Sequence, residues 1–265
     1  MVSFISKGRY GNFMFVACAA YAYSLKHGLG FHIQDKSLAE HLWPLYHQDL
    51  KNPNWNPDLE TVYVNDNQHP YRELEFKEEW RDKNIIIGTT DINTGYFQSY
   101  RYLKGYEDEI RIKFGLPVEY TNNKISCHIR RGDFLTYSDR HPVITKTYIE
   151  SAVSVLYKKE KLIAYYSDDI EWVKNNYPER YVDVYGNHFN IKSVFMEGES
   201  VEEDFKGIMK GEHIITSNSS FSVLAAILAP NTNKIVVCPR NFFGEGNKHL
   251  DTSTLYPHGW IKMDY

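Results

Sequence analysis

Apolar runs and amphipathic stretches alternate along the second half of the chain. Five short apolar runs predict β-strands, and stretches in which apolar side chains recur every three or four positions predict helices between them. The strands are expected at residues 124–129, 161–169, 181–186, 213–217 and 234–239, and the helices at 145–157, 170–176, 201–209 and 220–228. The apolar face expected on the first of these helices consists of Tyr148, Ile149, Ala152, Val155 and Leu156. Such alternation is typical of a parallel, doubly wound sheet, so the predicted fold class is α/β.

The first half of the chain is less regular. Strands are expected at residues 2–6, 61–64 and 84–88. A glycine turn and a buried helix follow the first of them. The sequence GLPVEYTNN, residues 115–123, has the composition of a hinge. We therefore predict an N-terminal domain at 1–118 and a C-terminal domain at 119–265.

The N-terminal region carries a pattern that imitates a secretory signal. Lys7 and Arg9 precede the apolar run FMFVACAAYAY. Because glycine turns separate these charges from the run, a strand, a turn and a buried helix explain the pattern better. No other stretch approaches the roughly 18 apolar residues that span a membrane. We expect no integral membrane span, while peripheral membrane association stays open.

Composition and charge narrow the class of ligand. Hydrophobic residues make up 42% and charged residues 24%, as in an ordinary globular protein. A net charge of -4 argues against nucleic acid or anionic membrane as a general partner, because phosphate backbones bind positive surfaces. Cys18, Cys127 and Cys238 form no CxxC pair, so neither a zinc site nor a disulfide scaffold is indicated. We expect a small ligand and a cytoplasmic location.

The stretch CHIRRGDF ends a predicted strand with a cluster of cationic groups. The alternation of the strand places His128 and Arg130 on one face at its carboxyl end, where ligands of such sheets bind. Arg131 and Asp133 follow in the turn that Gly132 permits. A guanidinium fork suits phosphate oxygens, at about 1.5–3 kcal/mol for each charge-assisted bond. The alternative is an arginine–aspartate ion pair that fastens the loop.

A second polar cluster, YYSDD, ends the next predicted strand. Asp168 and Asp169 could accept hydrogen bonds from ribose hydroxyls or a base. The alternative is structural, because Asp168 as helix N-cap with Glu171 three residues later would form a capping box. A metal site is less favoured, since no second carboxylate cluster has the spacing of a ligand set.

The stretch SNSS opens the last predicted helix. Its first turn has no acidic residue and offers backbone N–H groups, a combination that suits an anionic ligand. Capping alone explains Ser219 and Ser220 equally well. On the preceding helix, Asp204 could accept the N1–H and N2–H pair of guanine, or it belongs to a solvated acidic face with Glu202 and Glu203.

Six stretches carry a resemblance to a known family. They are KGRYGNFMFVACAAYAYSLKHG, GYFQSYRYL, CHIRRGDF, YYSDDIEWVK, EHIITSNSSFSVLAAIL and KIVVCPRNFF. Their order and approximate spacing resemble those of bacterial α-1,2-fucosyltransferases, which belong to glycosyltransferase family 11 within the α-1,2/α-1,6/O-fucosyltransferase superfamily. The resemblance implies a GT-B type fold, with two Rossmann-like domains facing across a cleft. The C-terminal domain would hold GDP-fucose, and the N-terminal domain would face the acceptor.

The resemblance also implies roles for single residues. Arg130 would meet the β-phosphate, Arg131 would fix the loop beside the donor, and Asp133 is a candidate general base or an orienting group for the arginines. His128 and Asp204 would lie near the nucleoside, and Ser219, Ser220 and Phe221 would line the diphosphate end. Asp168 is a donor-site candidate because of its place at the end of a strand, not because of the resemblance. The N-terminal glycine turn that would face the cleft consists of Gly8, Arg9, Gly11 and Asn12. No metal and no cofactor are expected, because guanidinium groups can stabilise the departing GDP.

The expected activity is inverting transfer of L-fucose from GDP-β-L-fucose to a terminal galactoside hydroxyl, with an α-1,2 linkage. The acceptor would be an oligosaccharide or an O-antigen-type glycan. The sequence departs from the family at Phe13 and Val16, where glutamines are usual, and at Val223 and Leu224, where tryptophans are common. These departures bear on acceptor choice. The alternatives are a GDP-sugar transferase of another linkage and a non-catalytic nucleotide-sugar-binding protein.

Overall fold

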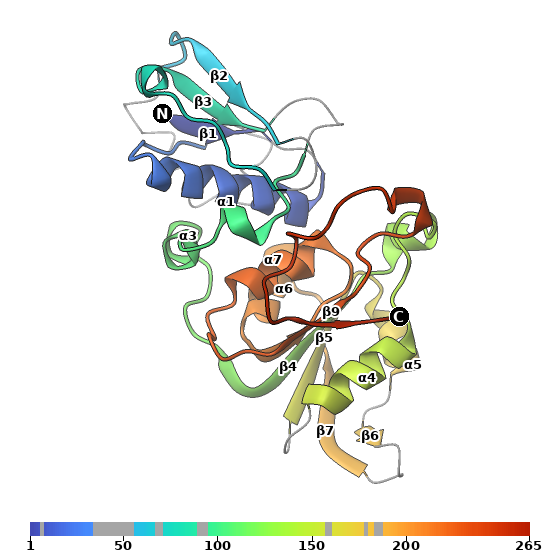
Figure 1. Ribbon diagram of the computed structural model, residues 1–265. Coiled ribbons are helices and arrows are strands. Elements are labelled where there is room, and N and C mark those ends of the chain that lie inside the picture. The colour runs from blue at the N-terminus through green and yellow to red at the C-terminus, as the bar shows by residue number, and fades with distance from the viewer. Residues whose placement is uncertain are drawn as a thin grey trace. The chain divides into compact units, whose positions relative to one another are not determined.

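The computed structural model describes residues 1–5, 8–33, 56–66, 71–88, 95–156, 161–177, 180–182 and 188–265. The chain divides into two compact units (Figure 1). Unit 1 comprises Met1–Leu116 and Leu250–Tyr256, and unit 2 comprises Pro117–His249 and Pro257–Tyr265. The chain therefore returns to unit 1 near its end, a crossing that has no counterpart in the sequence pattern.

Unit 1 is built on a three-stranded parallel sheet in the order β1-β3-β2. Its elements are β1 (Val2–Phe4), α1 (Tyr10–Lys26), β2 (Thr61–Val64), η2 (Glu78–Trp80), β3 (Asn84–Ile87), η3 (Tyr100–Tyr102) and α3 (Glu107–Lys113). All three strands predicted for the first half are confirmed, although the first ends at Phe4 and its predicted end at residue 6 lies outside the described residues. The signal-like apolar run forms α1, which is buried along most of its length against the sheet.

Unit 2 contains a seven-stranded sheet in the order β10-β9-β8-β4-β5-β7-β6. Neighbouring strands are parallel except for β6, which runs antiparallel to β7. The strands are β4 (Thr121–Ile129), β5 (Lys161–Ser167), β6 (Arg180–Val182), β7 (His188–Phe195), β8 (Gly211–Ile215), β9 (Val236–Pro239) and β10 (Ile261–Met263). The helices are η4 (Gly132–Leu135), α4 (Lys146–Leu156), α5 (Ile170–Asn176), α6 (Val201–Met209), α7 (Ser220–Leu228) and η5 (Glu245–Asn247). The predicted α/β class with parallel sheets is confirmed.

The sequence pattern located the helices of unit 2 better than its strands. The bounds predicted for α5, α6 and α7 are those observed. Two strands, β7 and β10, were not predicted, and residues 183–186 of the strand expected at 181–186 lie outside the described residues. On α4, Val153 is buried and Val155 is 40% exposed, so the predicted apolar face was wrong at that position.

Helices cover both faces of the sheet in unit 2 (Figure 1). On one face, Ile125, Cys127 and Ile129 of β4 pack in a core with apolar residues of α4 and α5. On the other face, Ser126 Oγ donates to the carbonyl oxygen of Gly207 on α6 at 3.3 Å. Alternate residues of β4 therefore face opposite layers, as the period of a strand requires. His128 is two residues beyond Ser126 on β4, so its side chain also lies on the α6 side of the sheet.

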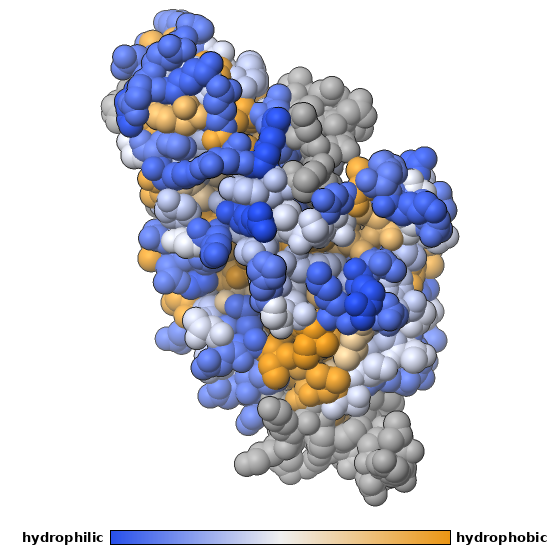
Figure 2. Space-filling model, viewed as in Figure 1, coloured by the Kyte–Doolittle hydropathy of each residue, from blue (hydrophilic) through white to orange (hydrophobic). Residues whose placement is uncertain are grey.

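Figure 2 shows hydrophilic side chains over most of the face in view, with an apolar patch among them. Among the described residues, none of the helices combines the length and the apolar character that crossing a bilayer requires.

Candidate functional site

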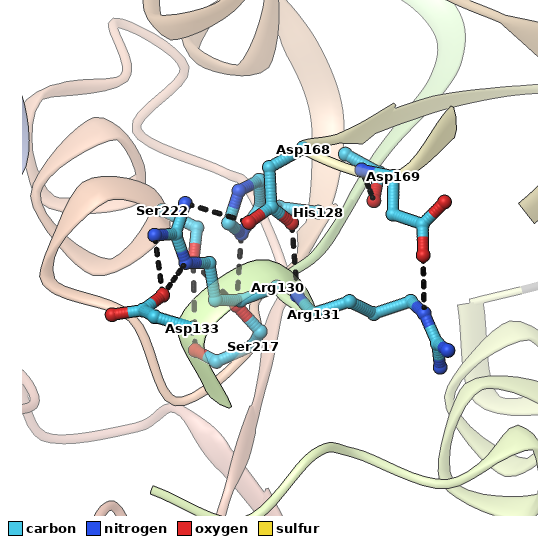
Figure 3. A network of polar contacts seen from close by, with 9 residues as sticks. His128, Arg130, Arg131, Asp133, Asp168, Asp169, Ser217 and Ser222 are labelled. Atoms are coloured by element: carbon cyan, nitrogen blue, oxygen red, sulfur yellow. Dashed lines mark hydrogen bonds and ion pairs between the residues drawn. The ribbon is translucent and has the colours of Figure 1, made fainter. Parts of the chain in front are cut away.

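Three adjacent strands of unit 2 bring the predicted polar residues to one edge of the sheet. Strand β4 pairs with β5 and with β8, and the pairs Ile129–Ser167 and Cys127–Ile215 lie close to the strand ends. The segments that follow these strands therefore meet at the carboxyl edge, where open α/β sheets bind ligands. Figure 3 shows the polar network that results, with residues contributed by all three segments.

Arg130 lies between two carboxylates. Its Nε and Nη2 donate to Asp133 Oδ1 at 3.2 and 2.6 Å, and its Nη1 lies 3.0 Å from Asp168 Oδ2 (Figure 3). The side chain is 16% exposed. The arginine–aspartate ion pair, which was the alternative to phosphate binding in the sequence analysis, is therefore present. Because a guanidinium carries five N–H donors, these contacts with described residues leave donors for a further oxyanion.

Arg131 is anchored more completely than Arg130. Its Nε donates to Asp169 Oδ2 at 3.0 Å, and its guanidinium carbon lies 3.5 Å from the centre of the Trp172 ring. Its backbone N–H donates to Asp168 Oδ1 at 2.9 Å. Stacking and ion pairing together hold this side chain against α5. The arrangement is that of an arginine that fixes its loop.

The helix cap predicted at Asp168 was wrong. Asp169 is the N-cap of α5, and its carboxylate accepts from the Trp172 N–H at 3.3 Å. The carboxylate of Asp168 instead contacts the two arginines. Gly132 is required by this contact, because a Cβ atom on it would overlap Asp168 Oδ2. The role of the glycine is thus close approach of the backbone to a carboxylate, rather than the turn conformation that the sequence suggested.

His128 is a buried, neutral group beneath the network. Its Nδ1 lies 2.8 Å from Ser217 Oγ, and its ring centre is 5.3 Å from that of Phe221 on α7. Burial lowers the pKa of the imidazole to about 3, so the ring carries no charge near neutral pH. His128 therefore provides hydrogen bonding and shape, and it links the end of β4 to the start of α7.

Asp204 is a half-buried carboxyl group on α6. Its Oδ1 is buried and has no hydrogen-bond partner among the described residues. Burial, assisted by the nearby Glu199 carboxylate, raises the pKa of Asp204 to about 6. The Asp204 charge also helps burial to raise the pKa of Tyr166, which lies beside His128 in the register of β4 and β5. Asp204 therefore does not belong to a solvated acidic face, which was the alternative in the sequence analysis.

The start of α7 matches the predicted anion site in part. Ser219 is the N-cap residue, but its side chain makes no capping hydrogen bond, and the first turn has no acidic residue. Ser220 and Phe221 are half-buried. Ser217, the first residue of SNSS, had no predicted role. It links His128 to α7, because its Oγ lies 2.8 Å from His128 Nδ1 and 3.5 Å from Ser222 Oγ. Capping by the Ser219 hydroxyl therefore does not account for that residue.

The glycine turn predicted near the N-terminus lies in unit 1. Gly8 has a φ of +99°, and a Cβ on it would lie 3.0 Å from Asn12 Nδ2, so glycine is favoured on both counts. Arg9 is the exposed N-cap residue of α1, and Gly11 is buried in its first turn. Asn12 Oδ1 accepts from Gln98 Nε2 at 2.7 Å. Gln98, the glutamine of GYFQSYRYL, had no predicted role.

No cation site accompanies these residues in the part of the chain that the structure describes. Groups of three or more His, Cys, Asp or Glu side chains that could hold a metal ion are absent there. Each aspartate near the arginines contacts a guanidinium or a backbone N–H instead. Independence from metal stays a prediction for experiment.

Proteins of Escherichia coli match a large part of the chain. The O-antigen biosynthesis glycosyltransferase WbnK is 31% identical over 189 residues, which cover 69% of this chain and 59% of that protein. An alpha-1,2-colitosyltransferase is 25% identical over 186 residues, which cover 64% of this chain and 61% of that protein. The chain therefore spans less than two thirds of the length of either relative.

Similar solved structures are more distant. A variant of Arabidopsis thaliana FUT1 in complex with GDP has a TM-score of 0.48 at 14% identity, with 91% of this chain and 71% of that chain covered. POFUT1 in complex with GDP-fucose has a TM-score of 0.42 at 13% identity, with 86% and 92% covered. Because both TM-scores lie below 0.5, the assignment to a family depends on the sequence. The family model of glycosyl transferase family 11 matches residues 4–264, and the chain therefore belongs to that family.

Proposed function

We propose that this protein is an inverting glycosyltransferase that moves L-fucose from GDP-β-L-fucose to a terminal galactoside hydroxyl in an α-1,2 linkage. Membership of family 11 supports a transfer reaction. The name of the 31% identical relative supports an O-antigen-type glycan as acceptor. In this proposal the two units are the Rossmann-like domains of a GT-B arrangement, unit 2 binds the donor, and neither a metal nor a cofactor takes part.

One juxtaposition carries the donor assignment. Unit 2 holds a cation with N–H donors to spare at the carboxyl edge of its sheet and, near Tyr166, a carboxyl oxygen that has no hydrogen-bond partner among the described residues. The cation is Arg130, and the oxygen is Oδ1 of Asp204. A nucleoside diphosphate has the matching chemistry, because its phosphates accept hydrogen bonds and a guanine base offers an N–H pair. Asp204 would receive the base, and Arg130 would receive the β-phosphate.

The chemistry asked of Arg130 is stabilisation of the leaving group. As the bond from the anomeric carbon to the β-phosphate oxygen breaks, negative charge grows on GDP and the sugar becomes oxocarbenium-like. N–H donors aimed at that oxygen interact more strongly with the transition state than with the bound donor. Asp133 and Asp168 hold the guanidinium from two sides, so its orientation is set before the donor arrives.

Asp133 serves better as a positioning residue than as the general base. Its Oδ1 accepts both hydrogen bonds from Arg130. Two hydrogen bonds to one carboxylate oxygen hold the guanidinium group in one orientation. We therefore assign Asp133 to the orientation of Arg130. Asp168 takes the same role from the other side, and its predicted contact with ribose stays a prediction.

The adjacent arginines provide a matched test. Arg130→Lys keeps one positive charge but loses the fork, so we expect it to fold, to bind GDP and to transfer fucose at least about a hundredfold more slowly. Arg131→Lys loses the stack on Trp172 and the bond to Asp169, so we expect a lower melting temperature and a transfer rate close to that of the parent below it. Both variants are measured by thermal melting, GDP titration and transfer of labelled fucose.

The outcome that overturns the site is specific. If Arg130→Lys melts early and yet transfers fucose at nearly the parental rate, the arginines are structural and the donor assignment fails. If both variants lose activity in proportion to their loss of folded protein at the assay temperature, Arg130 has no role beyond that of Arg131.

A second candidate donor is favoured by one relative. The 25% identical protein is named as a colitosyltransferase, so colitose is an alternative to fucose as the transferred sugar. Assays with both donors on one acceptor panel, followed by linkage analysis of the product, separate the two. Preference for the colitosyl donor would leave the roles of Arg130 and Asp204 in place and change the sugar alone.

A further inference from the structure

A half-buried lysine holds helix α6 against the sheet of unit 2. Lys124 precedes Ser126 by two positions on β4, so both side chains point to the α6 side. Lys124 Nζ donates to Tyr166 Oη at 2.9 Å and to the carbonyl oxygen of Gly207 at 2.8 Å. Because α6 ends at Met209, the Gly207 carbonyl lies in the last turn, where helix oxygens lack partners within the helix and attract a cation. The ammonium group therefore joins β4 and β5 to α6.

The ammonium group depends on these two acceptors. Burial, assisted by the nearby Lys210 charge, lowers the pKa of Lys124 to about 8. The group is therefore mostly protonated near neutral pH, although it has lost much of its hydration. Removal of the Tyr166 hydroxyl would leave a half-buried cation short of a partner. The contact between the sheet and α6 should thus respond to the loss of a single atom.

Gly207 allows the phenol ring of Tyr166 to touch the helix backbone. Tyr166 is 1% exposed. A Cβ atom at position 207 would lie 2.7 Å from both Cε1 and Oη of Tyr166, which is closer than such atoms can approach. Any larger residue at position 207 would push the ring and the helix apart. Direct contact of the ring with the backbone therefore sets the spacing between β5 and α6 at this point.

Asp204 lies on the same face of α6 as Gly207. Residues three positions apart on a helix are neighbours on its surface. Burial, and then the Asp204 charge, raise the pKa of Tyr166, so the phenol and the carboxyl group are near enough to interact. A shift of α6 against the Tyr166 ring would therefore carry the Asp204 carboxyl group with it.

We propose that Lys124 and Tyr166 are positioning residues, which fix α6 so that the Asp204 carboxyl group meets the N1–H and N2–H groups of a guanine base together. The inference deepens the proposed function and rests on it, because it requires that the base lies against Asp204. The effect of both residues passes through α6, and neither has to touch the nucleotide. A displaced carboxyl group could still accept one N–H group but would lose the pair, since hydrogen bonds weaken steeply when distance and angle depart from ideal values.

A comparison of GDP with IDP measures this alignment. IDP keeps the diphosphate and the N1–H group of the base but lacks the 2-amino group. If Asp204 accepts both N–H groups, the parent should bind GDP about tenfold to a hundredfold more tightly than IDP. Both nucleotides are titrated into the same protein by calorimetry, so any unfolded fraction cancels from the ratio of the two Kd values.

Three variants change the contact from three elements. Tyr166→Phe keeps the ring and removes the hydroxyl, whereas Lys124→Met keeps the length of the side chain and removes the charge. Gly207→Ala acts from α6, because its methyl group overlaps the Tyr166 ring. We expect each variant to lower the preference for GDP over IDP by at least about threefold, while the Kd for IDP changes by less than about threefold because Arg130 still meets the phosphates.

Tyr148→Phe is the matched control. Tyr148 is also 1% exposed, and its Oη donates to the carbonyl oxygen of Thr216 at 2.8 Å. It belongs to α4, which packs on the face of the sheet opposite to α6. The substitution deletes the same atom and a buried hydrogen bond, so we expect a lower melting temperature with the parental preference for GDP over IDP.

Three results would overturn the inference. Parental preference for GDP in folded Tyr166→Phe and Lys124→Met would mean that Asp204 is positioned without them. An equal loss of preference in Tyr148→Phe would mean that the effect is not specific to α6. Equal weakening of GDP and IDP in the variants would mean that the lysine and the tyrosine support the whole donor site and not Asp204.

Failure of the proposed function has a different signature. It would show in the parent, as equal affinity for GDP and IDP, or in Asp204→Asn, as an unchanged preference for GDP. Either result would remove the guanine assignment and this inference with it. A parent that prefers GDP, together with an Asp204→Asn variant that does not, leaves the guanine assignment standing whatever the Tyr166 and Lys124 variants show.

Discussion

Replacement of Asp204 by asparagine should raise stability and weaken donor binding at the same time. The folded protein holds this carboxyl group half-buried, with Oδ1 unpartnered among the described residues and its pKa raised from 3.8 to about 6. A carboxylate kept without a partner is a cost to folding that a ligand can offset. Asparagine has the same shape and removes the charge, so it separates the two effects.

The sign of the stability effect follows from the direction of the pKa shift. Between pH 3.8 and about 6 the folded state binds more protons at Asp204 than the unfolded state, so stability falls as the pH rises through this window. The cost is complete above pH 6 and absent below 3.8. The full shift corresponds to about 3 kcal/mol at most. Because Asp204 is only half-buried, solvent screening reduces this to about 1–2 kcal/mol.

Thermal melting at two pH values measures the effect. Asp204→Asn should melt roughly 2–8 °C above the parent at pH 7.5 and close to it at pH 4. A variant that melts below the parent at pH 7.5 would show that the carboxylate has a stabilising partner and would refute the reasoning.

Ligand binding should change in the opposite direction. GDP at a hundredfold excess over its Kd should stabilise the parent by about 2.7 kcal/mol, and ADP at the same concentration should not. In Asp204→Asn an amide replaces the double acceptor, so GDP should bind at least about tenfold more weakly, a loss of about 1.4 kcal/mol. For the parent, GDP affinity should fall as the pH drops below 6, since protonation removes one acceptor. Equal stabilisation by GDP and ADP would remove the guanine assignment.

Three further predictions concern the polar network and metal. Transfer activity should survive excess EDTA, and a loss that Mn²⁺ or Mg²⁺ restores would count decisively against charge stabilisation by Arg130 alone. Gly132→Ala should lower stability by about 1–3 kcal/mol and slow transfer, because its methyl group displaces Asp168; melting and turnover unchanged from the parent would show that the close approach is unimportant. Trp172→Leu should lower the melting temperature as Arg131→Lys does, with GDP affinity unchanged in a titration; a weakened GDP affinity would place this stack within the donor site.

Local sequence signals were sufficient for the helices of unit 2. Amphipathic spacing and terminal residues determined the bounds of α5, α6 and α7, because a helix makes its hydrogen bonds within its own segment. The strands depend on partners elsewhere. The three-residue strand β10 exists only through its pairing with β9, and so its sequence carried no recognisable signal.

The family motifs also placed much of the candidate site in advance. A strand that ends in CHIRRGDF and one that ends in YYSDD must bring their polar ends to one edge once they pair in parallel. The sequence could not choose between neighbours that differ by one position. Asp168 and Asp169 are equally good caps by composition, and the backbone geometry at the start of α5 selected Asp169. Packing against the sheet likewise selected Val153 over Val155.

What the sequence determined by itself is therefore the fold class, the order of most helices and strands, and the edge of the sheet at which the polar groups meet. These depend on residues close together in the chain. Tertiary structure alone decided which charged groups have partners: Arg131 stacks on Trp172, and Arg130 is shared between two aspartates. Asp204 Oδ1, in contrast, has no hydrogen-bond partner within the described part of the chain. Hydrogen-bond partners are set by distances of a few ångströms between segments far apart in sequence, and no local pattern encodes those distances.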